Sequence, residues 1–159
     1  MISQRLFDEL KLKKDFERVE QEVIVSVLRT SDDLEYRLRQ FFRQYDLSQQ
    51  QYNILRILRG AEGPLPILEI ANRLISKVPG ITGLIDKLEK RDLVARHRCE
   101  ADRRVWYVAL TKAGARLLTD MDGPNGALEE ALAGHLTEAE ARQLVLLLDR
   151  LRDVPNPEA

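Results

Sequence analysis

Apolar residues recur at helical spacing over most of the chain. Between residues 18 and 45 they lie three, four or seven positions apart, as on one face of an amphipathic helix. These positions are Val23, Val27, Leu34, Leu38, Phe41 and Tyr45. A second stripe of Ile24, Leu28 and Phe42 widens the face, which predicts a long helix that belongs to a dimer or a bundle.

Two shorter helices are predicted next. Ser48 and Gln51 have the spacing of a capping box, in which each side chain bonds the backbone amide of the other residue. A helix should therefore begin here and end at Gly60. Residues 63–66 (GPLP) predict a turn, and residues 67–74 follow with apolar positions at helical spacing, which predicts a third helix.

A fourth helix is predicted over residues 76–91. Ser76 offers a cap, and Pro79 suits a first helical turn, where the missing amide costs nothing. The apolar stripe consists of Ile81, Leu84, Ile85 and Leu88. The opposite face carries Gly80, Thr82, Gly83, Asp86, Lys87 and Lys90.

A β-hairpin is predicted over residues 93–110. Val94 and the apolar run at residues 105–110 flank a polar tip at residues 100–104. After it, Thr111 should cap a helix that is interrupted at residues 122–126 (DGPNG), because each of these residues disfavours a helix interior.

The last helix is predicted from a second capping box, formed by Thr137 and Glu140. Its apolar side consists of Leu144, Leu147, Leu148 and Leu151. The end of the chain, residues 155–159, contains proline and predicts a frayed tail.

Composition indicates one folded domain. The chain has 159 residues, of which 44% are apolar and 32% charged, near globular averages. No apolar run approaches the ~20 residues of a membrane helix, and the N-terminus lacks a secretory signal, so a cytoplasmic protein without membrane partners is expected. Cys99 is the only cysteine, which excludes an intramolecular disulfide and a cysteine-based zinc cluster.

Positive charge is concentrated in one segment. The formal net charge is −1, yet residues 87–104 hold seven Lys or Arg against four acids, a local +3. Nucleic-acid binding needs a positive surface, and this segment could supply one. A solvated charged face is the ordinary alternative.

Short helices followed directly by a hairpin are the layout of a winged helix-turn-helix, so the predicted fold is mainly α with a small β-hairpin. A helix about 10–12 Å across fits the major groove, about 12 Å wide, and a basic hairpin can follow the backbone into the minor groove. Phosphate contacts are expected from Lys87, Lys90, Arg96, Arg98, Arg103 and Arg104.

Five segments carry a family resemblance: residues 48–55 (SQQQYNIL), 70–74 (IANRL), 81–94 (ITGLIDKLEKRDLV), 102–104 (DRR) and 108–114 (VALTKAG). Together they resemble the MarR family of winged helix-turn-helix transcriptional regulators. The resemblance implies a homodimer whose first and last helices intertwine, and a repressor that binds a pseudo-palindromic operator on double-stranded DNA and is released by a small anionic or phenolic effector.

The resemblance also implies a division of the chain. Residues 1–46 would form the N-terminal dimerisation region, 47–112 the DNA-binding region and 113–154 the C-terminal dimerisation helices. In the wing, Asp102 would brace an arginine, and Arg103 or Arg104 would enter the minor groove. The expected DNA-binding residues are Ser76, Lys77, Pro79, Gly80, Thr82, Gly83, Lys87, Arg96, Arg98, Asp102, Arg103 and Arg104.

The sequence departs from the family pattern at three places. Gly83 stands where many relatives carry a larger residue, and each glycine inside a helix costs about 1 kcal/mol relative to alanine. Asp92 replaces the usual glycine after the reading helix, but aspartate tolerates the left-handed conformation required there. Cys99 lies in the hairpin, whereas redox-sensing relatives place their cysteine in the first helix.

The remaining residues allow other functions. An effector could contact Phe41, Phe42, Tyr45 and Tyr52, although aromatic residues at helical spacing more often form core. His97 and Cys99 share a strand face but are too few for a metal site. Neither an enzyme nor a cofactor is indicated, and a winged-helix module that binds protein instead of DNA is the alternative.

Overall fold

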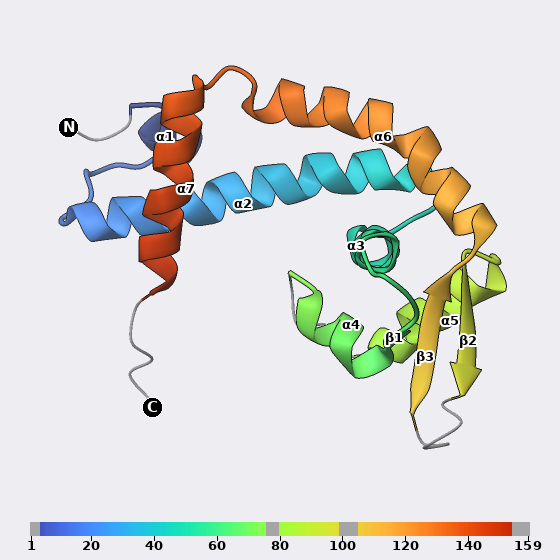
Figure 1. The fold of residues 1–159 in the computed structure, drawn as a ribbon. Helices are drawn as coiled ribbons and strands as arrows, with labels where there is room; N and C mark the ends of the chain where they lie inside the picture. The colour runs from blue at the N-terminus through green and yellow to red at the C-terminus, as the bar shows by residue number, and fades with distance from the viewer. Residues whose placement is uncertain (1–3, 76–79, 99–104, 154–159) are drawn as a thin grey trace.

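The computed structural model describes residues 4–75, 80–98 and 105–153, and these form helices and one small sheet (Figure 1). The helices are α1 (Gln4–Glu9), α2 (Val19–Arg43), α3 (Gln49–Arg59), α4 (Ile67–Arg73), α5 (Ile81–Lys90), α6 (Lys112–Ala133) and α7 (Glu138–Arg152). The strands are β1 (Leu65–Pro66), β2 (Val94–Arg98) and β3 (Trp106–Leu110).

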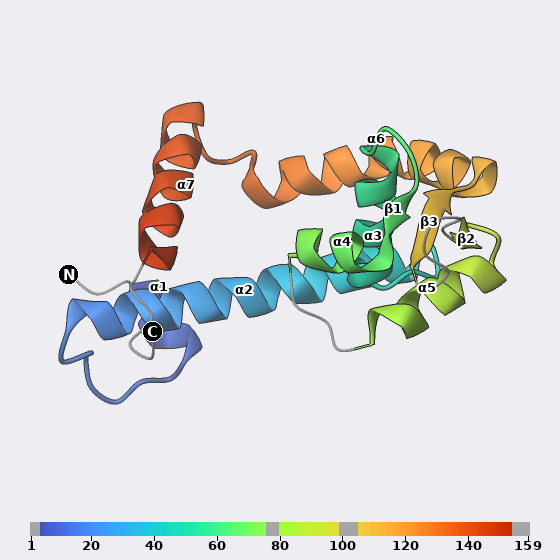
Figure 2. The ribbon, with the colours of Figure 1, turned by 60° about the horizontal axis from the view of Figure 1, so that its bottom comes forward.

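The molecule is elongated along α2. Helices α3, α4 and α5 and the sheet gather at one end of α2, whereas α1 and α7 lie at the other end (Figures 1 and 2). Within the described residues, no helix combines the length and the apolar character required to cross a bilayer.

The core lies where α3, α4, α5, the sheet and the first half of α6 meet. Apolar side chains at helical spacing point inward from each helix, and alternate residues do so from the strands. The fully buried residues are Ile54, Leu55, Ile70, Ile85, Leu88, Val94, Val108, Leu118 and Met121. Burial of each large side chain contributes about 1.5–3 kcal/mol, so this end of the molecule holds most of the apolar stabilisation of the fold.

The sheet has the order β1-β3-β2 and is antiparallel. The β2–β3 hairpin confirms the predicted one. Strand β1 differs from the prediction, because Leu65 and Pro66 belong to a segment whose residues predict a turn. It pairs with Val108 and Tyr107 of β3 and contains a proline, which only an edge strand tolerates.

Helix α6 runs without interruption to Ala133, so the predicted break at residues 122–126 is wrong. Contacts on both sides of Pro124 hold the helix together: Met121 and Asn125 are buried, and Asp122 pairs with Arg59 of α3 at 2.9 Å. This packing outweighs a proline penalty of about 3 kcal/mol.

Helix α5 begins at Ile81, so the predicted start at Ser76 is wrong. Its N-cap is Gly80, whose φ of 89° lies in the left-handed region, where glycine is at no disadvantage. Gly80 therefore lies at the N-cap and not inside the helix, as the predicted range of residues 76–91 would have placed it. Ser76, Lys77 and Pro79 lie outside the described residues.

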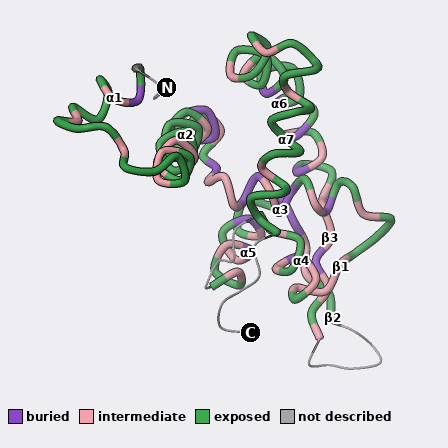
Figure 3. The backbone as a smooth tube through the Cα atoms, turned by 90° about the vertical axis from the view of Figure 1, so that its left-hand side faces the viewer, coloured by how far each residue is buried: buried purple, intermediate pink, exposed green. Residues whose placement is uncertain are grey.

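Helices α2 and α7 carry exposed apolar residues, and most of the backbone tube of α7 has the colour of exposed residues (Figure 3). On α2, Ile24 and Leu28 are more than half exposed, and so are Val145 and Leu146 on α7. In the described part of the chain, none of the residues of α7 is buried. Leu144, Leu147 and Leu151, on the apolar side predicted for the last helix, are also exposed, and the family resemblance predicts that the first and last helices pack in a dimer.

Candidate nucleic-acid interface

The exposed face of α5 carries only small residues in its first turn, and its long side chains are lysines nearer the C-terminal end. Thr82, Gly83, Lys87 and Lys90 are exposed, while Ile85 and Leu88 anchor the opposite side in the core. A Cβ atom added at Gly83 would meet no atom within 4 Å. The backbone of this first helical turn can therefore approach a ligand surface closely.

The end of α5 is fixed by a Schellman motif. The amide of Leu93 donates to the carbonyl of Leu88 at 3.0 Å, and that of Asp92 donates to the carbonyl of Glu89 at 2.9 Å. Asp92 has a φ of 55°, which confirms the left-handed conformation predicted for it. The motif turns the chain directly into β2, so α5 and the wing, defined here as the β2–β3 hairpin, are closely connected.

Arg96 joins the wing to α5. Its Nε donates to Glu89 at 2.8 Å, and its Nη2 bonds the carboxylate of Asp86. The side chain is only 18% exposed, and the bond to Asp86 is the largest cause of its raised pKa. We therefore interpret Arg96 as a brace, which differs from the phosphate contact expected from sequence.

The brace also changes the electrostatics of the interface. Asp86 and Glu89 are the acids of α5, and both are engaged by Arg96. The exposed cations Lys87 and Lys90 on the same helix therefore face solvent beside carboxylates that are already compensated. Sequence reasoning missed this arrangement, although acids three residues apart on a helix beside a basic strand position could have indicated it.

At the outer end of the wing, Arg98 lies over the ring of Trp106, 4.8 Å from its centroid. The two residues are direct partners in the β2–β3 register, and both are exposed. A guanidinium on an aromatic face keeps its charge and its donors while losing conformational freedom. Arg98 thus presents an exposed positive charge in a restricted orientation. Cys99, Asp102, Arg103 and Arg104 lie outside the described residues.

The aromatic group considered for an effector is part of the core. Phe42 stacks on Tyr52 with 4.4 Å between ring centroids, and Phe41 contacts both Phe42 and Tyr45 at 5.3 Å. Phe41, Phe42 and Tyr52 are buried, and burial raises the pKa of the Tyr52 hydroxyl. These rings fix α2 against α3 and line neither of the hollows described next.

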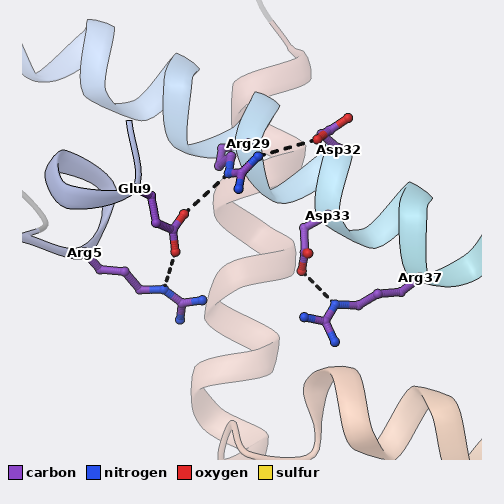
Figure 4. Close-up of polar contacts among 6 residues, drawn as sticks. All are labelled: Arg5, Glu9, Arg29, Asp32, Asp33 and Arg37. Atoms are coloured by element: carbon purple, nitrogen blue, oxygen red, sulfur yellow. Dashed lines mark hydrogen bonds and ion pairs between the residues drawn. The ribbon is translucent and has the colours of Figure 1, made fainter. Parts of the chain in front are cut away.

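Two hollows accompany α2. One, of about 390 Å³, lies between α2, α3 and the end of α4, and its lining includes Gln49, Gln50 and Asn53. The other, of about 470 Å³, lies between α1, α2 and α6. In the latter, Glu9 accepts from both Arg5 and Arg29, and Asp33 pairs with Arg37 at 2.8 Å (Figure 4).

Metal ligands do not gather in the described part of the chain. There, no three His, Cys, Asp or Glu side chains form a group that could hold an ion. His97 pairs with Tyr107 in the strand register.

A sequence model of the MarR family matches residues 47–106. The homoprotocatechuate degradative operon repressor of Escherichia coli is 30% identical over 70% of this chain and 74% of its own. A MarR transcription factor from Planctomyces limnophilus is 40% identical with a TM-score of 0.67, covering 85% of this chain and 98% of its own.

For a third similar protein, the solved structure concerns the regulation of its DNA binding by a small molecule. Bordetella bronchiseptica BpsR, whose structure describes regulation of DNA binding by 6-hydroxynicotinic acid, is 26% identical with a TM-score of 0.72 over 83% of this chain and 99% of its own. These relatives are regulators of transcription, and a protein-binding module without DNA binding is not favoured. The chain belongs to the MarR family of transcriptional regulators.

Proposed function

We propose that this regulator is a repressor that binds a pseudo-palindromic operator as a homodimer and is released by a small ligand. The observation that carries the proposal is the Arg96 brace: it holds the exposed face of α5 and the wing in one rigid unit and compensates the acids of α5. The relatives support repression and control by a ligand. A role in transcription also requires the compartment that holds the DNA, so we propose a cytoplasmic location.

In the proposed complex, α5 enters the major groove and the wing reaches the minor groove. Thr82 and the backbone at Gly80 and Gly83 approach the bases, while Lys87 and Arg98 neutralise phosphates. Ser76, Lys77, Pro79, Asp102, Arg103 and Arg104 are proposed contacts on sequence grounds alone. Arg96 is assigned to the brace instead.

The proposed dimer buries the exposed apolar faces of α2 and α7. Leu28, Val145 and Leu146 are 57–64% exposed in the single chain, which is costly for large apolar side chains gathered on two helices. A second copy with the same faces would cover them around a two-fold axis. Such an axis also places two α5 helices so that they can meet successive major grooves, about 34–36 Å apart.

The proposed effector site is the 390 Å³ hollow between α2, α3 and α4, not the aromatic group. Leu34, Leu38, Leu74 and Ile75 provide apolar walls, and three carboxamides provide donors and acceptors. Glu35 is the charged residue in this lining, and none of the described lining residues is basic. A neutral phenolic ligand therefore fits better than an anion.

Selection of bound duplexes from a random pool tests the proposed function. The purified protein should recover an inverted repeat whose half-sites are one helical turn apart. Recovery of unrelated sequences, or of none at low salt, would contradict operator binding.

A further inference from the structure

The C-terminal ends of α2 and α5 meet through one side chain. Arg91, the C-cap of α5, donates from Nη1 to the carbonyl oxygen of Asp46 at 2.5 Å and from Nη2 to that of Tyr45 at 3.1 Å. These carbonyls follow directly after α2. The two hydrogen bonds therefore link the helix that carries the dimer face to the helix that faces DNA.

The geometry of α2 presents these carbonyls. Asp46 has a φ of 53°, and the amide of Leu47 donates back to the carbonyl of Phe42 at 3.1 Å, which closes the helix end. The last carbonyls of a helix lack intrahelical partners and carry partial negative charge. A planar guanidinium can bond two neighbouring carbonyls at once, whereas an ammonium cannot do so in one fixed orientation.

We propose that Arg91 is a positioning residue for DNA binding: it fixes the angle of α5 against α2 and thereby the spacing of the two α5 helices in the dimer. The proposal rests on the dimeric DNA-binding function proposed above. Each protomer contributes one Arg91, so removal of this side chain frees both α5 helices to change their angle against α2. DNA binding must then restrict that freedom, which lowers the affinity.

The free dimer provides a test without DNA. A spin label on Gly83→Cys, in a Cys99→Ser background, reports the distance between the two α5 helices, and a side chain at position 83 meets open space. With Arg91 present, pulsed electron resonance should give a narrow distance distribution. Arg91→Ala should broaden it, and Arg91→Lys should restore it in part.

Two comparisons make this test decisive. Lys90→Ala removes the same charge from the neighbouring exposed position and should leave the distribution unchanged. Arg91→Gln serves in place of Arg91→Ala if thermal unfolding shows that the alanine variant does not fold. An Arg91→Ala distribution as narrow as that of the parent protein would overturn the proposal.

Duplex affinity separates positioning from direct binding of phosphate. Arg91→Ala should weaken binding to a selected duplex by about tenfold, with an unchanged dependence on salt. A salt slope that becomes shallower by about 0.9, as expected when one phosphate is no longer neutralised, would make Arg91 a phosphate ligand and would also overturn the proposal. If the parent protein binds no duplex, operator binding fails, while the spin-label comparison still decides the role of Arg91.

Discussion

Arg96 on the wing strand β2 bonds Asp86 on α5, one helical turn before its second partner Glu89. The strand and the helix are thus joined by side chains as well as by the Schellman turn at Asp92. In the proposed complex α5 and the wing occupy neighbouring grooves at once, and this relationship would fix their relative placement before DNA arrives.

Removal of the brace should weaken DNA binding although Arg96 itself is not a proposed DNA contact. Arg96→Ala leaves Asp86 and Glu89 uncompensated beside the exposed cations of α5, and we expect a loss of affinity of about tenfold or more. The loss of unfolding free energy should be smaller, about 1 kcal/mol, because both carboxylates are partly exposed. Fluorescence anisotropy and thermal unfolding measure the two effects.

A triple variant is the control for this prediction. Addition of Asp86→Asn and Glu89→Gln to Arg96→Ala removes the uncompensated charges and should restore much of the affinity. The same two changes added to Arg98→Ala should not restore the affinity that Arg98→Ala removes. Failure of the triple variant to recover would mean that the loss does not come from uncompensated charge: an unchanged salt slope would assign it to the missing brace, and a slope shallower by about 0.9 to a missing phosphate contact.

Gly114 is expected to be indispensable for the start of α6. A Cβ at this position would overlap the carbonyl oxygen of Leu93 and approach Cδ1 of Leu110 to 2.7 Å. Gly114→Ala should therefore reduce the free energy of unfolding by about 1–3 kcal/mol. Gly123→Ala, where the added atom meets open space within the same helix, should instead stabilise by up to about 1 kcal/mol. Chemical denaturation of the two variants should give opposite signs.

The sequence predicted those features of the fold that depend on residues close together in the chain. The capping boxes at Ser48 and Thr137 both form, because each needs only residues three positions apart. The continuity of α6 could not be predicted in this way, since it depends on tertiary contacts: the burial of Met121 and Asn125, and the pairing of Asp122 with Arg59, which is 63 positions away.

In the candidate nucleic-acid interface, too, the sequence predicted features set by neighbouring residues and missed those set by residues far apart in the chain. Lys87 and Arg98 are exposed, as their places in an amphipathic helix and an outer strand suggested. The pairing of Arg96 with Asp86 and Glu89 could not be predicted in this way, because the fold brings both partners to it. Strand β1 likewise exists only because β3 offers an edge to Leu65 and Pro66.

A charge placed on the exposed face of α7 should dissociate the proposed dimer. Leu147 is half exposed in the single chain, and Leu147→Glu would bury a carboxylate in the interface, at a high cost. Sedimentation should show a shift from dimer to monomer and a matching loss of operator affinity. Leu68→Glu changes an exposed leucine on α4, and dissociation of the dimer by that change as well would contradict the assignment of the interface.

Ligand binding should depend on the hollow between α2, α3 and α4 and not on the aromatic core. Asn53→Leu replaces a carboxamide of the lining and should abolish the rise in melting temperature that a neutral phenol produces in the parent protein. Tyr52→Phe removes only a hydroxyl from the aromatic group and should leave that rise intact. If Asn53→Leu kept the rise in melting temperature and Tyr52→Phe abolished it, the effector site would instead involve the aromatic residues.

The affinity of the dimer for a selected duplex as a function of salt tests the central claim, that the face of α5 and the wing bind DNA. The logarithm of the binding constant should fall linearly with the logarithm of salt concentration, by about 0.9 per neutralised phosphate. A Lys87→Ala, Arg98→Ala double variant should bind more weakly and with a shallower slope. Equal affinity and equal slope for the parent protein and the double variant would contradict the claim.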